Sequence, residues 1–302
     1  MMRGRLTLLL IITAASACSI DVAPATTVAA PPPAATPPPP TVAPVASTTT
    51  STMGVSASCL MGDIPFAGEG LVGVFGEDSG DAAAVAGVRW SATERCERVE
   101  IDLVTVAGSP AATLGRTTAE LRPRSGLLRI TLPPEVDTTS LADTVVDTPL
   151  VVRAYVVRLD TGGLAIDLHL QAPSGAAARA FLAASPARIV VDLQPGSGDT
   201  PINPPRTTTG VVLLGPGAGP AEYPLRVTGY ARAVGGELVA VLAPGTPDRV
   251  ERPIAPTGGV ESWGEFTTVF ETGPRGMVEL LVGDPAAEVG GATGLEIVLD
   301  LR

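Results

Sequence analysis

The feature that most constrains the fold is a two-residue alternation of apolar and polar side chains in many short runs. In residues 97–104, Val99, Ile101 and Leu103 occupy one face of an extended chain, and charged residues occupy the other. Similar runs in the first half of the chain are residues 127–132, 150–159, 164–171 and 187–193. Runs of this kind indicate half-buried strands. The sequence therefore predicts a mainly β protein, with one or two helical turns expected only in the alanine-rich residues 176–184.

The last third of the chain carries a second set of short runs. They are residues 210–214, 223–231, 237–242, 249–254, 265–271, 277–282 and 295–301. Seven strands separated by turns within about 100 residues predict an immunoglobulin-like β-sandwich. The Cys…Trp…Cys pattern of antibody domains is absent from this part of the sequence, so its core must be held by packing alone.

The N-terminus has the organisation of a bacterial export signal. Arg3 and Arg5 precede an apolar run at residues 6–12, and small residues 14–17 lead to Cys18. The apolar run is too short for a stable bilayer span. The Ala-Ser-Ala-Cys ending resembles the lipobox, in which the cysteine is acylated and becomes the first mature residue. This predicts a signal peptide at 1–17 and a lipid anchor at Cys18 on the extracytoplasmic face of the cell membrane; the alternative is ordinary secretion with cleavage near Ala17.

A charge-free segment rich in proline, alanine and threonine follows the signal. It runs from Val22 to about Gly54 and contains prolines 31–33 and 37–40. Such a composition buries too little apolar surface to offset the entropy lost on ordering. We therefore expect residues 18–56 to form a disordered linker.

The composition excludes several classes of function. The net charge is −11 and the isoelectric point is near 4.6, which argues against nucleic acid as a partner. All 20 basic residues are arginine, so a P-loop lysine, a Schiff base and a Ser-Lys dyad are excluded. Together with abundant Ala, Gly, Val and Pro, this composition is typical of a GC-rich, actinobacterial genome.

Two cysteines remain once Cys18 is assigned to the anchor. Cys59 and Cys96 form an even pair in an oxidising compartment, which predicts a disulfide that stabilises the fold by about 4 kcal/mol. Two buried free thiols or a metal site are the alternatives. Two thiols and a single distant histidine make a poor zinc set.

The sequence contains few candidates for catalysis. His169 is the only histidine, and on a strand it shares a face with Asp167. The motif G-x-S-x-G is absent from the sequence, and we expect this pair to lie on a solvated or partly covered strand face. The acidic residues 77–81 lack EF-hand spacing and predict a solvated turn. Residues 215–220, Gly-Pro-Gly-Ala-Gly-Pro, predict a loop between strands instead of a phosphate cradle.

Two tryptophans are the largest aromatic residues of the chain. Trp263 stands at the start of a predicted strand, and we expect it to pack at the end of the sandwich instead of contacting a ligand. Trp90 precedes the polar turn 91–95 and has no clear assignment. From these residues we expect no catalytic site, no metal site and no cofactor.

Three segments of the first half resemble the AMIN-like domain of actinobacterial envelope lipoproteins. They are CERVEIDL at 96–103, LVVRAYVVRLDTGGLAIDLHLQAP at 150–173 and ARAFLAASPARIVVDL at 178–193. Related AMIN domains help position envelope machinery on peptidoglycan, so the resemblance implies binding and localisation. It supplies no catalytic residues.

The second half resembles the immunoglobulin-like domain first described in bacterial spore-germination proteins. The resemblance is carried by PLRVTGYA at 224–231, SWGEFTTVFE at 262–271 and GLEIVLDL at 294–301. That family implies a structural or interaction module without a catalytic set of its own.

Together these observations predict an AMIN-like β-rich domain at 57–196, a hinge at 197–208 and an immunoglobulin-like β-sandwich at 209–302. The expected protein is a membrane-anchored extracytoplasmic lipoprotein with a non-catalytic binding or scaffolding role, whose partner is peptidoglycan or an envelope protein. The alternatives are a cell-wall hydrolase and a solute-binding lipoprotein.

Overall fold

The computed structural model describes residue 59 and residues 63–171, 175–196, 205–232, 238–284 and 294–302. The chain divides into two units, Met1–Thr50 and Ser51–Arg302, and all of the described residues lie in the second. The signal peptide, Cys18 and the linker predicted at 18–56 lie outside the described residues. Within the described residues the chain is almost entirely β, which confirms the predicted fold class.

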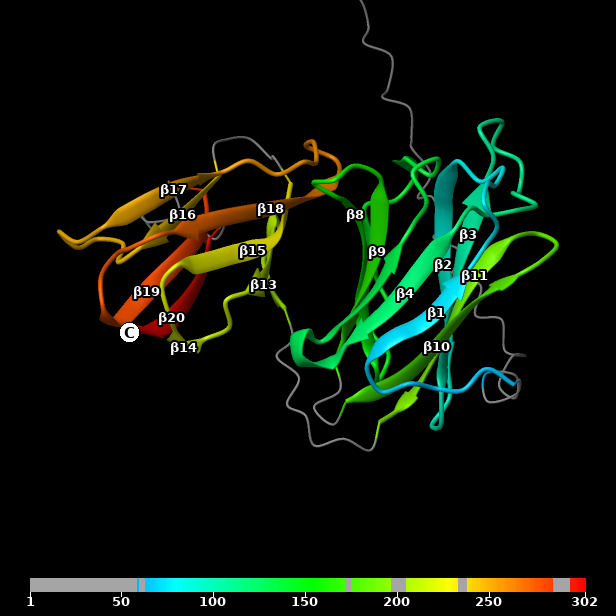
Figure 1. Cartoon of the computed structure of the whole chain (residues 1–302), viewed down its shortest axis with the longest axis horizontal. Coiled ribbons are helices and arrows are strands. Elements are labelled where there is room, and N and C mark those ends of the chain that lie inside the picture. Colours follow the sequence, from blue (N-terminus) through cyan, green and yellow to red (C-terminus); the bar gives the residue numbers. More distant parts are fainter. Residues whose placement is uncertain (1–58, 60–62, 172–174, 197–204, 233–237, 285–293) are drawn as a thin grey trace, which may run out of the picture. The chain divides into compact units, whose positions relative to one another are not determined.

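The N-terminal half is a sandwich of two sheets (Figure 1). One sheet contains β1 (Gly70–Phe75), β4 (Thr117–Arg122), β5 (Leu127–Thr131), β9 (Leu164–Leu170), β8 (Val151–Arg158) and β7 (Asp143–Val145). The other has the order β10 (Ala176–Ala183), β11 (Arg188–Pro195), β3 (Glu97–Val104), β2 (Ala84–Ala92) and β6 (Thr138–Thr139). A short 3-10 helix, η2 (Pro123–Ser125), connects β4 to β5.

The alternation in the sequence explains how these two sheets pack. Strand β3 alternates between buried and half-buried residues along its whole length, and Val99 and Ile101 are fully buried. They join Leu128, Ile130 and Val191 in one apolar core between the two sheets. The two-residue period therefore places one face of β3 in the core and the other on the outside of the sandwich.

A tight turn between Arg158 and Leu164 joins β8 to β9. Gly162 and Gly163 have φ angles of 90° and 79°, a region that side-chain-bearing residues rarely adopt. The two glycines therefore allow the tight turn that sets the register of β8 against β9, in which Arg158 pairs with Leu164.

The helical turns expected within residues 176–184 are wrong, because this segment forms β10. It pairs with β11 without interruption, from Ala176 opposite Pro195 to Ala183 opposite Arg188. The helix propensity of alanine is a weak preference that tertiary pairing overrides. Small side chains also suit this position, because β1 approaches closely there: a Cβ added to Gly73 would lie 2.4 Å from the carbonyl oxygen of Ala180.

The C-terminal half is a second sandwich. Its first sheet contains β12 (Arg206–Thr207), β13 (Val211–Gly215), β15 (Leu225–Ala231) and β18 (Trp263–Phe270). Its second sheet has the order β14 (Gly219–Ala221), β20 (Leu295–Leu301), β19 (Gly276–Gly283), β16 (Leu238–Leu242) and β17 (Val250–Ile254). The apolar core between them includes Val227, Phe270, Leu280 and Leu299. All seven runs predicted for this half contain strands. Of the loop predicted at 215–220, residues 216–218 join β13 to β14, whereas Gly215 ends β13 and Gly219 and Pro220 belong to β14.

One ladder connects the two sandwiches. The first residues of β18 pair in parallel with the end of β8, Trp263 with Val157 and Gly264 with Arg158. Through this contact the sheet of β1, β4, β5, β9 and β8 continues into β18, β15, β13 and β12. A ten-stranded sheet therefore belongs to both halves, and one of its faces carries the side chains described next.

Candidate functional site

Five buried side chains form an apolar and aromatic cluster where β8 meets β18. They are Tyr155, Val157, Val212, Tyr230 and Trp263. The ring of Trp263 stands edge-on to those of Tyr155 and Tyr230, with centroid distances of 5.1 and 5.9 Å. Such edge-to-face contacts add to the stabilisation that burial provides. Trp263 is 1% exposed, so it packs at this end of the sandwich as expected, and it also borders the cleft described below.

The strand register explains why polar residues accompany this cluster. Arg129 on β5 lies opposite Asp167 on β9, and Asp167 lies opposite Tyr155 on β8. Directly opposed residues share one face of a sheet. Arg129 bonds both carboxylate oxygens of Asp167, at 2.8 and 2.7 Å, and its third nitrogen bonds Glu265 on β18 at 2.6 Å. Arg129 thus joins the two sandwiches through two carboxylates.

The expectation that Asp167 and His169 lie on a solvated or partly covered strand face is wrong. Asp167 is fully buried and His169 is 5% exposed. The face looks amphipathic in the sequence, but β15 and β18 cover it, and Tyr230 of β15 hydrogen-bonds Nε2 of His169. The residue that covers His169, Tyr230, lies 61 positions further along the chain. Local alternation does not reveal such a long-range contact.

Burial lowers the pKa of His169 from its usual 6.5 to about 3, and the positive charges of Arg153 and Arg129 act in the same direction. Burial also raises the pKa of Tyr230. Both groups are consequently neutral at pH 7. A general acid or base works best with a pKa near the working pH, and the pKa of His169 lies well below pH 7.

A cleft of about 570 Å³ lies beside the cluster. Its charged lining residues are Asp143 on β7, Arg153 on β8 and Arg232, which directly follows β15. The remaining lining residues are Val152, Tyr155, His169, Leu170, Pro205, Thr207, Thr208, Thr209 and Trp263. With His169 neutral, two arginines and one aspartate leave the lining with a net charge of +1.

Asp143 organises the charged part of the cleft. One of its oxygens accepts hydrogen bonds from Nε1 of Trp263, at 2.9 Å, and from Nη2 of Arg232. Its other oxygen lies 3.4 Å from Nη1 of Arg153. The guanidinium of Arg232 also lies over the ring of Trp263, 4.6 Å from the centroid, which is a cation–π contact.

The two arginines of the cleft differ in how tightly they are held. Arg232 has an ion pair, a ring beneath it and a buried Nε that finds no hydrogen-bond acceptor among the described residues. Arg153 has one long ion pair, its guanidinium lies 5.7 Å from the centroid of the Tyr155 ring, and its side chain is 35% exposed, against 25% for Arg232. Arg153 is therefore the cation best placed to interact with a molecule in the cleft.

Sequence reasoning did not identify Asp143, Arg153 or Arg232 as a site. Each stands alone in its own segment, and no short motif joins them. The sequence offered one signal: Arg153 lies within the predicted strand 150–159, and Arg232 directly follows the predicted strand 223–231. The cleft forms because β7, β8 and the end of β15 come together in the fold.

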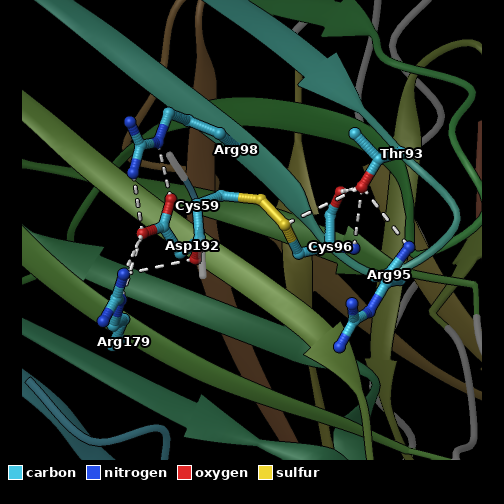
Figure 2. Close-up of a disulfide and its surroundings, with 7 residues drawn as sticks. All are labelled: Cys59, Thr93, Arg95, Cys96, Arg98, Arg179 and Asp192. Carbon is cyan, nitrogen blue, oxygen red and sulfur yellow. Dashed lines mark hydrogen bonds and ion pairs between the residues drawn. A yellow bond between two sulfur atoms is a disulfide. The ribbon is translucent and has the colours of Figure 1, made fainter. Parts of the chain in front are cut away.

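Cys59 and Cys96 are joined by a disulfide, which confirms the predicted pairing (Figure 2). Their Cα atoms are 6.4 Å apart. The carbonyl oxygens of Cys59 and Ile64 accept hydrogen bonds from Arg179, at 3.2 and 2.9 Å. The segment that leads into the fold is therefore attached to the sheet of β10, β11 and β3 both covalently and by hydrogen bonds.

A buried ion-pair network lies beside this disulfide (Figure 2). Asp192 is fully buried on β11 and pairs with Arg98 of β3 at 2.7 Å and with Arg179 of β10 at 3.0 Å. The ring of Phe66 packs against the Arg179 guanidinium, with 4.7 Å to the centroid. All three strands thus contribute one charge to a network that the N-terminal segment covers.

Of the remaining candidates, Asp81 has a structural role. The carboxylate of Asp81 accepts bonds from the backbone N–H groups of Thr113 and Ala112, at 2.8 and 3.0 Å, and these bonds lower its pKa. The acidic segment 77–81 therefore holds a neighbouring loop. Trp90 is 40% exposed on β2. The part of the chain that the structure describes contains no cluster of three or more His, Cys, Asp or Glu side chains arranged to hold a metal.

Among the described residues, no helix has the length and apolar character needed to cross a bilayer. Comparison with family models, with curated proteins and with solved structures finds no match for this chain.

Proposed function

We propose that the protein is a membrane-anchored extracytoplasmic lipoprotein that acts as a non-catalytic binding or scaffolding module at the cell envelope. Its partner is peptidoglycan or an envelope protein. The proposal rests on one structural observation above all, the positively charged cleft beside the β8–β18 contact. A net positive cleft in a chain of net charge −11 is a local concentration of charge suited to an anionic partner.

The chemistry of the cleft favours binding over hydrolysis. Glycoside hydrolysis generally requires two carboxylates that flank the scissile bond. Among the described residues that line the cleft, Asp143 is the one carboxylate, and three neighbouring groups already engage it. His169 is held neutral and bonded to Tyr230. This arrangement supplies fixed charges and an aromatic wall for recognition.

The sequence supports the envelope location. The basic residues, apolar run and lipobox-like ending of residues 1–18 are the basis for the membrane anchor, and the proline-rich segment after them is suited to a spacer. The resemblances to AMIN-like and spore-germination-type immunoglobulin-like domains add the expectation of a binding module near peptidoglycan.

The anchor is tested by fractionation of cells that express Cys18→Ala. We expect the variant to leave the membrane fraction or to keep its signal peptide. Cys59→Ser with Cys96→Ser serves as the matched control, because it removes cysteines without touching the anchor. A Cys18→Ala protein that is processed and fractionates like the parent would contradict the lipoprotein assignment.

The binding role is tested by crosslinking in living cells, followed by identification of the attached molecules, and by cosedimentation with purified sacculi. We expect one dominant envelope partner and no soluble fragments released from sacculi. Sustained release of wall fragments that is lost in Asp143→Asn would instead establish a hydrolase. Absence of any envelope partner would contradict the proposed function.

A further inference from the structure

We propose that the cleft binds a monoanionic organic carboxylate and that Arg153 is the residue that recognises the carboxylate. This inference deepens the envelope-binding function proposed above and rests on it for the source of the ligand. The ligand class follows from three properties of the cleft: its charge, the availability of Arg153, and its size and walls.

The charge of the cleft matches a single negative charge. Arg153 and Arg232 contribute two positive charges, Asp143 contributes one negative charge, and His169 is neutral. One bound carboxylate brings the sum to zero. A phosphate dianion would leave the cleft with a net charge of −1. The fixed carboxylate of Asp143 would also repel its two charges more strongly than the single charge of a carboxylate.

The geometry makes Arg153 the contact residue. Asp143 holds Arg232 against Trp263, so Arg232 provides a fixed background charge. Arg153 has a longer ion pair, at 3.4 Å, and a more distant ring contact, 5.7 Å from the centroid of Tyr155, and more than a third of its side chain is exposed. An arginine guanidinium matches a carboxylate with two parallel hydrogen bonds, which makes such pairs both strong and specific for planar anions.

The size and walls of the cleft fit the rest of an organic molecule. A volume of about 570 Å³ lies within the range of sites that bind small molecules. Val152, Leu170 and Tyr155 add apolar surface to the lining, and the three threonines at 207–209 add hydroxyl groups. The site therefore suits a short peptide end or a sugar acid, which share the carboxylate and differ in the remainder.

The test is calorimetric titration of the purified full-length protein with its disulfide intact. The probes are N-acetyl-alanyl-alanine with a free C-terminal carboxylate, the same peptide as its C-terminal amide, glucuronate and inorganic phosphate. We expect the free peptide acid or glucuronate to bind, and we expect the amide and phosphate to bind at least about tenfold more weakly. The stronger of the two carboxylates identifies the source as a peptide or a sugar.

Three variants test the residues. Arg153→Gln should weaken carboxylate binding by at least about tenfold, because a charge-assisted hydrogen bond is lost. Asp143→Asn should strengthen it about three- to tenfold, because a competing carboxylate is removed. Arg89→Gln is the control: Arg89 is an exposed arginine paired with Asp102 outside the cleft, and its loss should leave affinity unchanged.

The outcomes separate this inference from the proposed function. If none of the carboxylates binds, or phosphate binds as well as they do, the inference is overturned, whatever the sacculi and crosslinking experiments show. It is also overturned if Arg153→Gln binds like the parent. Carboxylate binding that depends on Arg153, without any envelope partner in cells, would support the site and contradict the envelope function. Thermal unfolding of each variant establishes that it is folded before titration.

Discussion

The two sandwiches are stabilised in different ways. The N-terminal half buries ionisable groups, namely Glu97, Asp167, His169, Arg179 and Asp192, and it carries the disulfide. In the described residues of the C-terminal half, the buried side chains are apolar or aromatic, and their core runs from Val211 to Leu301. Similar strand patterns thus give one half in which buried charge pairs and a covalent bond supplement the apolar core, and another held by packing alone.

This difference predicts which single substitutions should change the free energy of unfolding most. A buried charge that loses its partner is costly, because desolvation is no longer compensated. An apolar core responds more gradually, since volume-conserving exchanges are tolerated. The N-terminal half should therefore be sensitive to substitutions that change charge without changing size.

The largest expected effect is that of Asp192→Ala. The substitution removes the carboxylate that pairs with Arg98 and Arg179, whose side chains are 13% and 3% exposed. We expect a loss of about 3–5 kcal/mol in the free energy of unfolding. Urea unfolding measures the loss, and amide hydrogen exchange should place it in β3 and β11 while β16 and β19 stay protected.

The matched control is Asp102→Ala on the same sheet. Its partner Arg89 is 57% exposed, so the pair should contribute about 0–1 kcal/mol. If Asp192→Ala costs no more than Asp102→Ala, or if exchange increases equally in both halves, the contrast between the sandwiches is wrong.

The second effect concerns the disulfide. Replacement of Cys59 and Cys96 by serine should lower the stability of the N-terminal half by about 2–4 kcal/mol, because a cross-link over 37 residues is lost. Mass mapping without reductant verifies the bond in the parent protein. Unchanged exchange in β3 after its removal would show that the hydrogen bonds from Arg179 alone hold the N-terminal segment.

The third effect is a pH dependence from His169. Its folded-state pKa is about 3, against 6.5 in the unfolded chain, so only the unfolded chain binds the proton between these values. Stability therefore rises with pH from about 3 to 6.5, by about 1.4 kcal/mol per unit. On lowering the pH from 7 to 4, we expect His169 to remove roughly 3 kcal/mol.

This dependence is measured as the difference between the parent and His169→Gln across pH 4–7. The difference is needed because burial raises the pKa of Glu97, which makes stability fall with rising pH just above the usual range of a glutamate. Both proteins contain Glu97, so its contribution cancels. Parallel pH profiles of the two proteins would contradict the burial of a neutral His169.

The smallest effect is that of Tyr230→Phe. The substitution keeps the ring but removes the hydroxyl that bonds Nε2 of His169, and we expect a loss of about 1–2 kcal/mol. Tyr223→Phe is the control within the C-terminal half: its hydroxyl donates to the carbonyl of Pro274 at 2.8 Å on a partly exposed site. Only Tyr230→Phe should also reduce the pH dependence of stability that His169 causes, because it removes the hydroxyl bonded to the imidazole.

Much of the fold could be predicted from local pattern. The alternation in residues 97–104 and 295–301, and the two glycines at 162 and 163, correspond closely to β3, β20 and the β8–β9 turn. Short or small-residue strands such as β1, β6 and β10 could not be recognised in this way. Their strand conformation comes from pairing partners distant in the sequence, and alanine alone favours a helix.

The candidate site shows the same division. The pairing of Cys59 with Cys96 could be predicted by counting, because Cys18 was assigned to the anchor. The cleft could not, because no motif joins its charged residues. Pairing of β7 with β8 brings Asp143 near Arg153, and Arg232 joins them where β18 meets β8.

The β class, most of the strands, the disulfide pair and the acidic charge follow from the sequence, because each depends on the two-residue period of a strand or on a count of residues. The tertiary structure alone decided that the face carrying Asp167 and His169 is buried and that one sheet continues through both sandwiches. Alternation along a strand indicates only that one face is apolar and the other polar, and it does not indicate what packs against the polar face. What covers a polar face depends on long-range pairing, and here the same contact buries the imidazole and forms a positively charged cleft.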